Sequence, residues 1–225
     1  MYLSKITFST ETAGTSQIRE WVTRGEYAIH QWVWRHFNNQ TERSFLYSTH
    51  FTKTGCDILV LSNDAPLQIA GVNLQTKLFN PKLDPGKHLE FEILVNPTVA
   101  RPDPDGAPGQ RKRGKRCDIM MHIKYHNRQL RGPDLEEAQT EAILQWFRRQ
   151  GDKAGFAFKN EDISVHNEGV QDLYAGKRHI HFGVARLKGL LEVTEPEKFV
   201  QMLASGIGSQ KAFGCGLMLI RPARA

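Results

Sequence analysis

The segment GIGSQKAFGCG, residues 206–216, decides which folds the chain can adopt. A Walker A loop requires G-x-x-x-x-G-K-[ST] between a strand and a helix, and a dinucleotide-binding loop requires G-x-G-x-x-G at the start of a helix. Here Lys211 precedes its glycine, and it occupies the position of the third glycine in the dinucleotide pattern. The nine residues after Gly216 are also too few to complete a mononucleotide fold. The spacing therefore excludes both nucleotide-binding folds and predicts a turn between a helix and the last strand.

Two interpretations of this turn remain open. Gly206 is typical of a residue that ends a helix, in which case the rest of the segment is a plain turn. Alternatively, the glycines at 206, 208, 214 and 216 permit backbone with positive φ and the close approach of a partner. In that case exposed N–H groups and Lys211 face an anion.

The residues that surround this turn predict a β-α-β-β-α-β order. Pro196 is suited to the first position of a helix that runs to Ser205. Apolar spacing, with acidic residues in the first turn and basic residues in the last, predicts a helix at 135–149. Strands are expected at 117–124, 156–165, 179–193 and 217–220, with a loop at 167–177.

The first 96 residues predict the same order. Strands are expected at 1–8, 45–50, 56–62 and 89–95, a long helix at 18–37 and a short helix at 67–78. The intervening segment 97–116 is rich in proline and glycine and ends in the run RKRGKR. The sequence therefore predicts an α+β fold of two tandem ferredoxin-like (βαββαβ, RRM-like) domains, residues 1–96 and 117–225, joined by a basic linker at 97–116.

Composition favours a polyanionic partner. The net charge is +6, and lysine and arginine favour binding to nucleic acid because condensed counterions are released. The three cysteines are far apart, which fits a reducing cytosol and no disulfide scaffold. The N-terminus does not resemble a signal peptide, and no apolar run is long enough to span a bilayer. A cytoplasmic protein with no membrane association is expected.

The helix that contains YAIHQWVW, residues 27–34, carries the candidate catalytic side chains. Tyr27 and His30 share one face beside the apolar stripe, as expected where a helix borders a cleft. A histidine can transfer a proton near neutral pH, and a neighbouring tyrosine can orient it or bind phosphate. Arg35 projects further round the helix. The alternative interpretation is a surface His–Tyr pair without a catalytic role.

Basic side chains cluster in the run RKRGKR. It consists of Arg111, Lys112, Arg113, Lys115 and Arg116 around one glycine. Such a run is either a solvated loop or the lining of a groove for duplex RNA, which proteins recognise mostly through phosphates and shape. The spacing of His122 and His126 on a strand does not suit a metal site, and no carboxylate cluster completes one near His179 and His181.

Together these stretches resemble one family, the CasE endoribonucleases, which process CRISPR RNA in type I-E Cascade. The resemblance rests on the opening MYLSKI, on Tyr27-x-x-His30-Gln31 with the later Trp34 and Phe37, and on Gly206-Ile-Gly-x-x-Lys211-x-x-Gly214-Cys-Gly216-Leu217. It spans the whole chain.

The resemblance implies metal-independent cleavage of CRISPR repeat RNA at the base of its hairpin. The 2′-OH attacks the scissile phosphate and leaves a 2′,3′-cyclic phosphate and a 5′-OH. His30 is implied as general acid or base, Tyr27 as the group that orients it or stabilises the phosphorane, and Arg35 as the accompanying basic residue. The protein would retain the mature crRNA alongside other Cascade subunits, with no metal and no nucleotide cofactor.

RNA contacts are expected from the glycine-rich turn, the basic run and the second domain. The predicted residues are Gly206, Gly208, Lys211, Gly214, Gly216, Arg111, Lys112, Arg113, Lys115, Arg116, Lys177 and Arg178. A non-catalytic RNA-binding scaffold subunit is the alternative function, against which the Tyr27 and His30 pair argues. A small nucleotide-binding enzyme that uses the glycine-rich turn is a third, weaker possibility.

Overall fold

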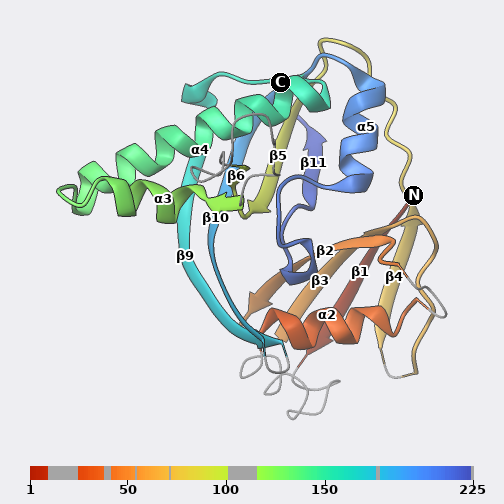
Figure 1. The fold of residues 1–225 in the computed structure, drawn as a ribbon. Coiled ribbons are helices and arrows are strands. Elements are labelled where there is room, and N and C mark those ends of the chain that lie inside the picture. Colours follow the sequence, from red (N-terminus) through yellow and green to blue (C-terminus); the bar gives the residue numbers. More distant parts are fainter. Residues whose placement is uncertain are drawn as a thin grey trace, which may run out of the picture.

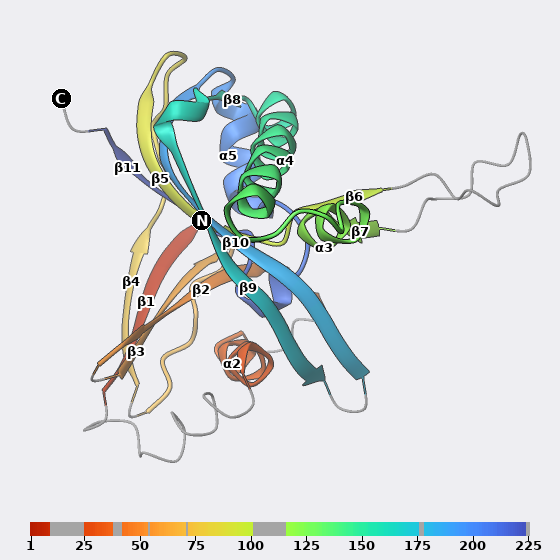
Figure 2. The same cartoon turned by 90° about the vertical axis from the view of Figure 1, so that its left-hand side faces the viewer.

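The computed structural model describes residues 1–9, 25–37, 42–53, 55–70, 72–100, 116–175 and 178–223. Figures 1 and 2 show two sheets, one formed in the first part of the chain and one in the second. Helix α2 lies along one face of the first sheet, and helices α4 and α5 cover one face of the second.

The first sheet has a ferredoxin-like strand order. Its elements are β1 (Tyr2–Ser9), α2 (Glu26–Trp34), β2 (Phe45–Thr52), β3 (Gly55–Ser62) and β4 (Asn73–Leu78). The order across the sheet is β2-β3-β1-β4, and every pair is antiparallel. This is the order that a βαββαβ unit gives, although the described residues between β3 and β4 contain no helix.

The second sheet repeats the arrangement. Its elements are β5 (His88–Val95), α4 (Gly132–Ala154), β8 (Phe156–Ala157), β9 (Ile163–Ala175), β10 (Arg178–Val193), α5 (Pro196–Ser205) and β11 (Met218–Pro222), with single 3-10 turns η1 (Asn160–Asp162) and η2 (Lys211–Phe213). The strand order is β11-β5-β10-β8, and β9 also pairs with β10. The predicted class of two tandem ferredoxin-like domains is therefore confirmed.

Strand β5 belongs to the second sheet, and this corrects the expected division of the chain. The sequence pattern places 89–95 last in the first domain, yet β5 pairs with β10 and β11. The predicted boundary after residue 96 therefore does not separate the two sheets. Periodicity identifies a strand but carries no information about its partners, which lie about 100 residues further along the chain.

The expected helix at 67–78 is wrong, because its second half is strand β4. Residues Tyr2 to Thr7 of β1 pair with Leu78 to Asn73, so β4 satisfies backbone groups at the second edge of β1. The side chains of β4 are largely exposed. Without a buried face, the strand lacks the alternation by which its sequence could reveal it.

The expected strand at 117–124 is mostly helix α3 (Ile119–His126), preceded by β7 (Arg116–Asp118). The Asp118 carboxylate accepts a hydrogen bond from the Met121 N–H at 3.0 Å, which caps the helix. Strand β7 pairs with β6 (Thr98–Ala100). Both ends of the segment 97–116 therefore lie in the second domain, and the segment does not link the two domains. Residues 101–115 lie outside the described part of the chain.

The expected loop at 167–177 is instead strand in the described residues up to Ala175. Strands β9 and β10 form a long hairpin, with one register shift between Val184 and Ala185. The two views show this hairpin extending past its own sheet to the side of α2 (Figures 1 and 2), and α2 contacts β9.

Each sheet has its own hydrophobic core, and two smaller clusters join the domains. One joining cluster comprises Leu173, Phe182, Val184 and Cys215, with Tyr27 and Phe213 packed against it. The other contains Leu46, Leu61 and Leu217, which come from β2, β3 and the segment before β11. Burial of these apolar side chains holds the two domains in one arrangement.

A buried polar network fixes the end of β5. The Asn96 side chain donates to the Asp118 carboxylate at 2.6 Å and to the Gly183 carbonyl oxygen at 2.8 Å. The Gly183 N–H donates in turn to the same carboxylate at 2.8 Å. This network ties β5, the start of α3 and β10 together.

Replacing Asn96 by alanine is expected to lower the free energy of unfolding by about 2–3 kcal/mol, because the buried Asp118 carboxylate and Gly183 carbonyl each lose one donor. The matched control is Asn73→Ala, at an exposed position of β4, which is expected to cost less than about 1 kcal/mol. Urea unfolding measures both values. Equal losses would contradict the assigned importance of the network.

Candidate active site

Helix α2 places Tyr27 against the second domain, and His30 follows about one turn later on the same helix. Its apolar stripe, Ala28, Ile29, Trp32 and Val33, is buried against the first sheet. The Tyr27 ring lies 6.4 Å from the ring of Phe213 in η2, measured between centroids. The helix that the sequence singled out therefore contacts the glycine-rich turn, although the two are about 180 residues apart in the chain.

Aromatic rings surround His30. Its ring centroid lies 5.6 Å from that of Trp34, 5.7 Å from that of Phe45 and 6.1 Å from that of Tyr47. Within the described residues, the buried His30 Nδ1 has no hydrogen-bond partner. Burial, and secondly the positive charge of Arg43, lowers the pKa of His30 to about 4. The imidazole is thus neutral at pH 7 and able to accept a proton.

Arg43 is a site residue that the sequence reasoning missed. It lies two residues before β2 and lines a cavity of about 600 Å³ together with Arg116, His181 and Lys211. Asp118 also borders this cavity, but its carboxylate is engaged by Asn96 and Gly183. No local pattern marks Arg43, because only the folded β2 brings it to the helix that carries His30.

A buried tyrosine connects α2 to the glycine-rich turn. The Tyr47 hydroxyl lies 3.0 Å from both the Glu26 and the Ala212 carbonyl oxygens, and its hydrogen is shared between these acceptors. Thr49 donates a hydrogen bond to the Glu26 carboxylate at 3.3 Å. Burial nevertheless raises the pKa of the Glu26 carboxyl, with the hydrogen bonds from Tyr47 and Thr49 opposing that shift.

The glycine-rich turn is folded tightly on itself. Gly206 caps α5 with a φ of +73°, and a Cβ on it would lie 2.8 Å from the Gly216 carbonyl oxygen. A Cβ on Gly216, whose φ is +92°, would lie 2.8 Å from the Ile207 carbonyl oxygen. A Cβ on Gly208 or on Gly214 would likewise meet protein atoms at 3.1 Å. All four glycines have positive φ, and a Cβ at Gly206 or Gly216 would clash with backbone of the protein itself. Their contact with RNA stays a prediction.

Lys211 begins η2 within this turn and lines the cavity beside Arg43. Its ammonium donates to the Ser205 carbonyl oxygen at 2.7 Å, which leaves two of its three N–H donors for other partners. Burial, followed by the charges of Arg43 and Arg116, lowers the pKa of Lys211. Concentrated positive charge of this kind is stabilised when an anion enters the site.

The remaining predicted residues are less closely associated with His30. Arg35 is exposed at the C-terminal end of α2, and it is the Arg43 guanidinium whose charge acts on His30. Arg116 is exposed in β7 and borders the same cavity as Lys211. Arg178 begins β10. Lys177 and the run members Arg111, Lys112, Arg113 and Lys115 lie outside the described residues.

Histidine pairs elsewhere do not complete a metal site. His122 and His126 lie on helix α3 and not on a strand, with ring centroids 4.1 Å apart. Asp172 pairs with His179 and His181 on the exposed face of the β9–β10 hairpin. Among the residues that the structure describes, no group of three or more His, Cys, Asp or Glu side chains is arranged to hold a metal ion. Nor does any described helix have the length and apolar character needed to cross a membrane.

The sequence profile of the CRISPR associated protein family matches residues 1–222. The chain belongs to this family.

Relatives of this CRISPR associated protein are similar along their full lengths. The chain is 27% identical over 227 residues to the "CRISPR system Cascade subunit CasE" of Escherichia coli K12, covering 99% of this chain and 100% of that one. The resemblance to CasE is thereby confirmed.

Solved structures share the fold. A CRISPR endoribonuclease Cse3 bound to 19-nucleotide RNA has a TM-score of 0.72 at 20% identity, with 99% and 100% of the two chains covered. Cas6e from E. coli K-12 has a TM-score of 0.66 at 23% identity and the same coverage. Thermus thermophilus Cse3, bound to an RNA that represents a pre-cleavage complex, has a TM-score of 0.69 at 20% identity with 98% of each chain covered.

The close packing of the glycine-rich turn predicts that Gly216→Ala lowers the free energy of unfolding by at least about 3 kcal/mol, because positive φ and a steric clash act together. The matched control is Gly169→Ala, where φ is +84° and a Cβ meets no atom within 4 Å. This control is expected to cost only about 1–2 kcal/mol. Chemical denaturation of both variants makes the comparison, and a Gly216→Ala loss no larger than the control would refute the clash.

The position of Arg43 predicts a measurable change in the titration of His30. In Arg43→Gln the repulsion of the imidazolium is removed, so the pKa of His30 is expected to rise above about 4. It should remain below the ordinary value because burial, the larger cause, persists. NMR titration of the histidine ring measures this shift, and Arg35→Gln is the control expected to leave it unchanged. An unchanged His30 in Arg43→Gln would rule out the assigned coupling.

Proposed function

We propose that the protein is a metal-independent endoribonuclease that cleaves CRISPR repeat RNA at the base of its hairpin. The observation that carries this proposal is the contact of helix α2, through Tyr27, with the glycine-rich turn, next to a cavity lined by Arg43, Arg116 and Lys211. The charge of Arg43 acts on His30 of the same helix. The full-length similarity to CasE of E. coli and to a Cse3 bound to RNA supports the same assignment.

The proposed reaction needs only proton transfer and charge stabilisation. The 2′-oxygen forms a bond to the adjacent phosphorus as neutral His30 accepts the 2′-OH proton. The P–O5′ bond then breaks, and the departing oxygen takes up a proton to give a 5′-OH and a 2′,3′-cyclic phosphate. Because the nucleophile belongs to the substrate, proximity is already supplied. Arg43 and Lys211 offset the negative charge that develops on the phosphorane, and Tyr27 orients the reacting groups.

With a pKa of about 4, His30 is unprotonated in the free protein but is a weak proton acceptor. When RNA phosphate enters, its negative charge opposes that of Arg43 and raises the pKa of His30 towards neutrality. The imidazole then accepts the 2′-OH proton more readily, and the imidazolium can pass that proton to the far more basic departing 5′-oxygen. One histidine can thus act in both steps.

In this proposal the product remains bound within a Cascade-type complex in the cytoplasm; the similarity to a Cascade subunit of E. coli supports assembly into such a complex. The second candidate is an RNA-binding scaffold subunit without cleavage. The presence of His30 and Tyr27 on one helix, with the charge of Arg43 acting on His30, favours the enzyme, because RNA binding alone needs no histidine that can transfer a proton.

Incubation of the protein with a synthetic CRISPR repeat hairpin in EDTA tests the proposal. Cleavage is expected to persist without metal and to leave a 2′,3′-cyclic phosphate. His30→Ala is expected to lower the single-turnover rate by about 10²–10⁴-fold because the proton acceptor is lost. His88→Ala, an exposed histidine at the start of β5, is the control expected to keep the wild-type rate. Binding of the hairpin without cleavage by the intact protein would support the scaffold.

A further inference from the structure

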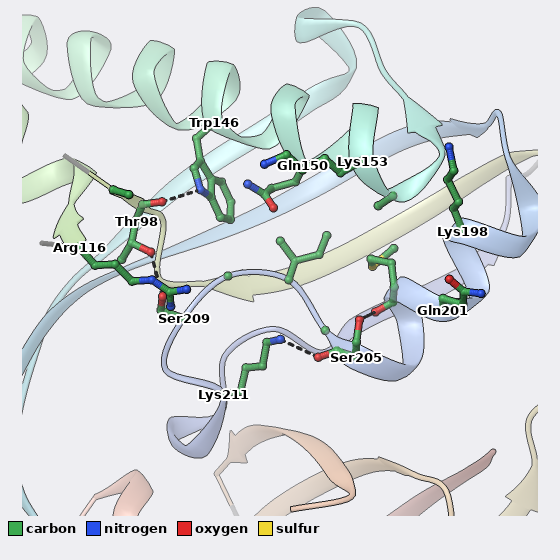
Figure 3. Close-up of a pocket in the computed structure, with 16 residues that line it drawn as sticks. Thr98, Arg116, Trp146, Gln150, Lys153, Lys198, Gln201, Ser205, Ser209 and Lys211 are labelled. Carbon is green, nitrogen blue, oxygen red and sulfur yellow. Dashed lines mark hydrogen bonds between the residues drawn. The ribbon is translucent and has the colours of Figure 1, made fainter. Parts of the chain in front are cut away.

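A second cationic cavity lies beside the glycine-rich turn, on the side of the helices that cover the second sheet. It has a volume of about 530 Å³ and lies between α4, α5, the turn and the β6–β7 pair (Figure 3). Arg116, Lys153, Lys198 and Lys211 contribute to its lining, and none of the described lining residues is a carboxylate. Such a lining attracts an anion.

This cavity adjoins the one beside Arg43 and shares part of its lining. Thr98, Arg116, Gly208, Ser209 and Lys211 line both. The positive groups therefore form a path that begins near the helix of His30, passes the glycine-rich turn and ends between α4 and α5. A chain of phosphates can follow such a path, whereas a single phosphate occupies only one position along it.

The lysines at the far end retain donors for a ligand. Lys198 pairs with Glu195 at 2.6 Å, but both side chains are about half exposed, so this pair is weak and easily exchanged. Lys153 makes no ion pair with any residue in the described part of the chain. Figure 3 shows both lysines with Gln150 and Gln201, whose amides can donate to phosphate or 2′-hydroxyl oxygens.

The lining offers no surface on which a base can stack. Trp146 is the aromatic residue among those described at this cavity, and it is only 2% exposed. Its indole N–H is already used, because it donates to the Thr98 carbonyl oxygen at 3.1 Å. The cavity is thus equipped to contact a sugar-phosphate backbone and not to read base identity.

We propose that this cavity binds the backbone of single-stranded RNA that flanks the repeat hairpin. The inference rests on the proposed function, because the flank is continuous with the strand at the active site. The volume lies within the range of small-ligand pockets, about 300–1,000 Å³, which accommodates one or two nucleotides of a single strand but not a duplex. Recognition there is independent of base sequence.

Binding of five RNAs to the full-length protein tests the proposal. They are the bare repeat hairpin, and the hairpin extended by ten nucleotides of uridine or of mixed sequence at either the 5′ side or the 3′ side. The measured quantity is the ratio of the Kd for the bare hairpin to the Kd for each extended RNA. One side is expected to tighten binding by about 5–20-fold in the wild type, equally for both flank sequences. In Lys153→Gln/Lys198→Gln this ratio is expected to fall to about 1.

The control is Lys77→Gln/Lys82→Gln, which lowers the net charge equally at exposed positions in and after β4. It is expected to retain the wild-type ratio. The slope of log Kd against log salt concentration for flank binding should also fall by about 1.4 units in Lys153→Gln/Lys198→Gln, because two phosphate contacts to a single strand are lost.

Each result bears on a separate part of the inference. The flank site is overturned if the Kd ratio is near 1 in the wild type, or if Lys153→Gln/Lys198→Gln retains the wild-type ratio. Neither result bears on cleavage of the hairpin. A ratio that depends on flank sequence overturns recognition of the backbone alone. Failure of the wild type to bind the bare hairpin would instead refute the proposed function.

Discussion

The shared hydrogen of the Tyr47 hydroxyl is the constraint on which the arrangement of the site depends. Tyr47 comes from β2, yet it lies between the Glu26 carbonyl group at the start of α2 and the Ala212 carbonyl group in the glycine-rich turn. The side chain is completely buried, so water cannot replace it as a donor to these oxygens. The position of α2 relative to the turn is therefore set by one residue of the first sheet, and the distance from His30 to Lys211 is fixed with it.

Local patterns predict the elements that have a strong period or a distinct end. The helix beginning at Pro196 ends before Gly206, and the strands around residues 6 and 58 are apolar and buried. Local patterns could not predict which strands pair with one another. Strand β5 has the same alternation whichever sheet receives it, and β4 is held by backbone pairing with β1 and not by a buried face. Helix α3 was missed because the capping signal of Asp118 lies within a run of apolar residues that also suits a strand.

In the candidate site, too, local spacing predicts the residues that share one helix but not the contacts between distant segments. Tyr27 and His30 share a helix, so their spacing alone brings them together. Arg43 is brought to His30 by the folding of β2, and no spacing rule joins residues 30 and 43. The sequence leaves two interpretations of the glycines open, a plain turn after a helix cap or the close approach of a partner. In the structure, a Cβ on Gly206 would meet the Gly216 carbonyl oxygen, a Cβ on Gly216 would meet that of Ile207, and a Cβ on Gly214 would meet Glu26. An absent side chain indicates close approach but does not identify which molecule approaches.

Because β6 pairs with β7, the two ends of the segment between them lie side by side in the second domain. The connection between the two sheets is instead the short segment from β4 to β5. A change in the number of basic residues between β6 and β7 therefore need not alter how the two sheets are joined. The attraction of this segment to a polyanion and the geometry around His30 can thus be changed independently of each other.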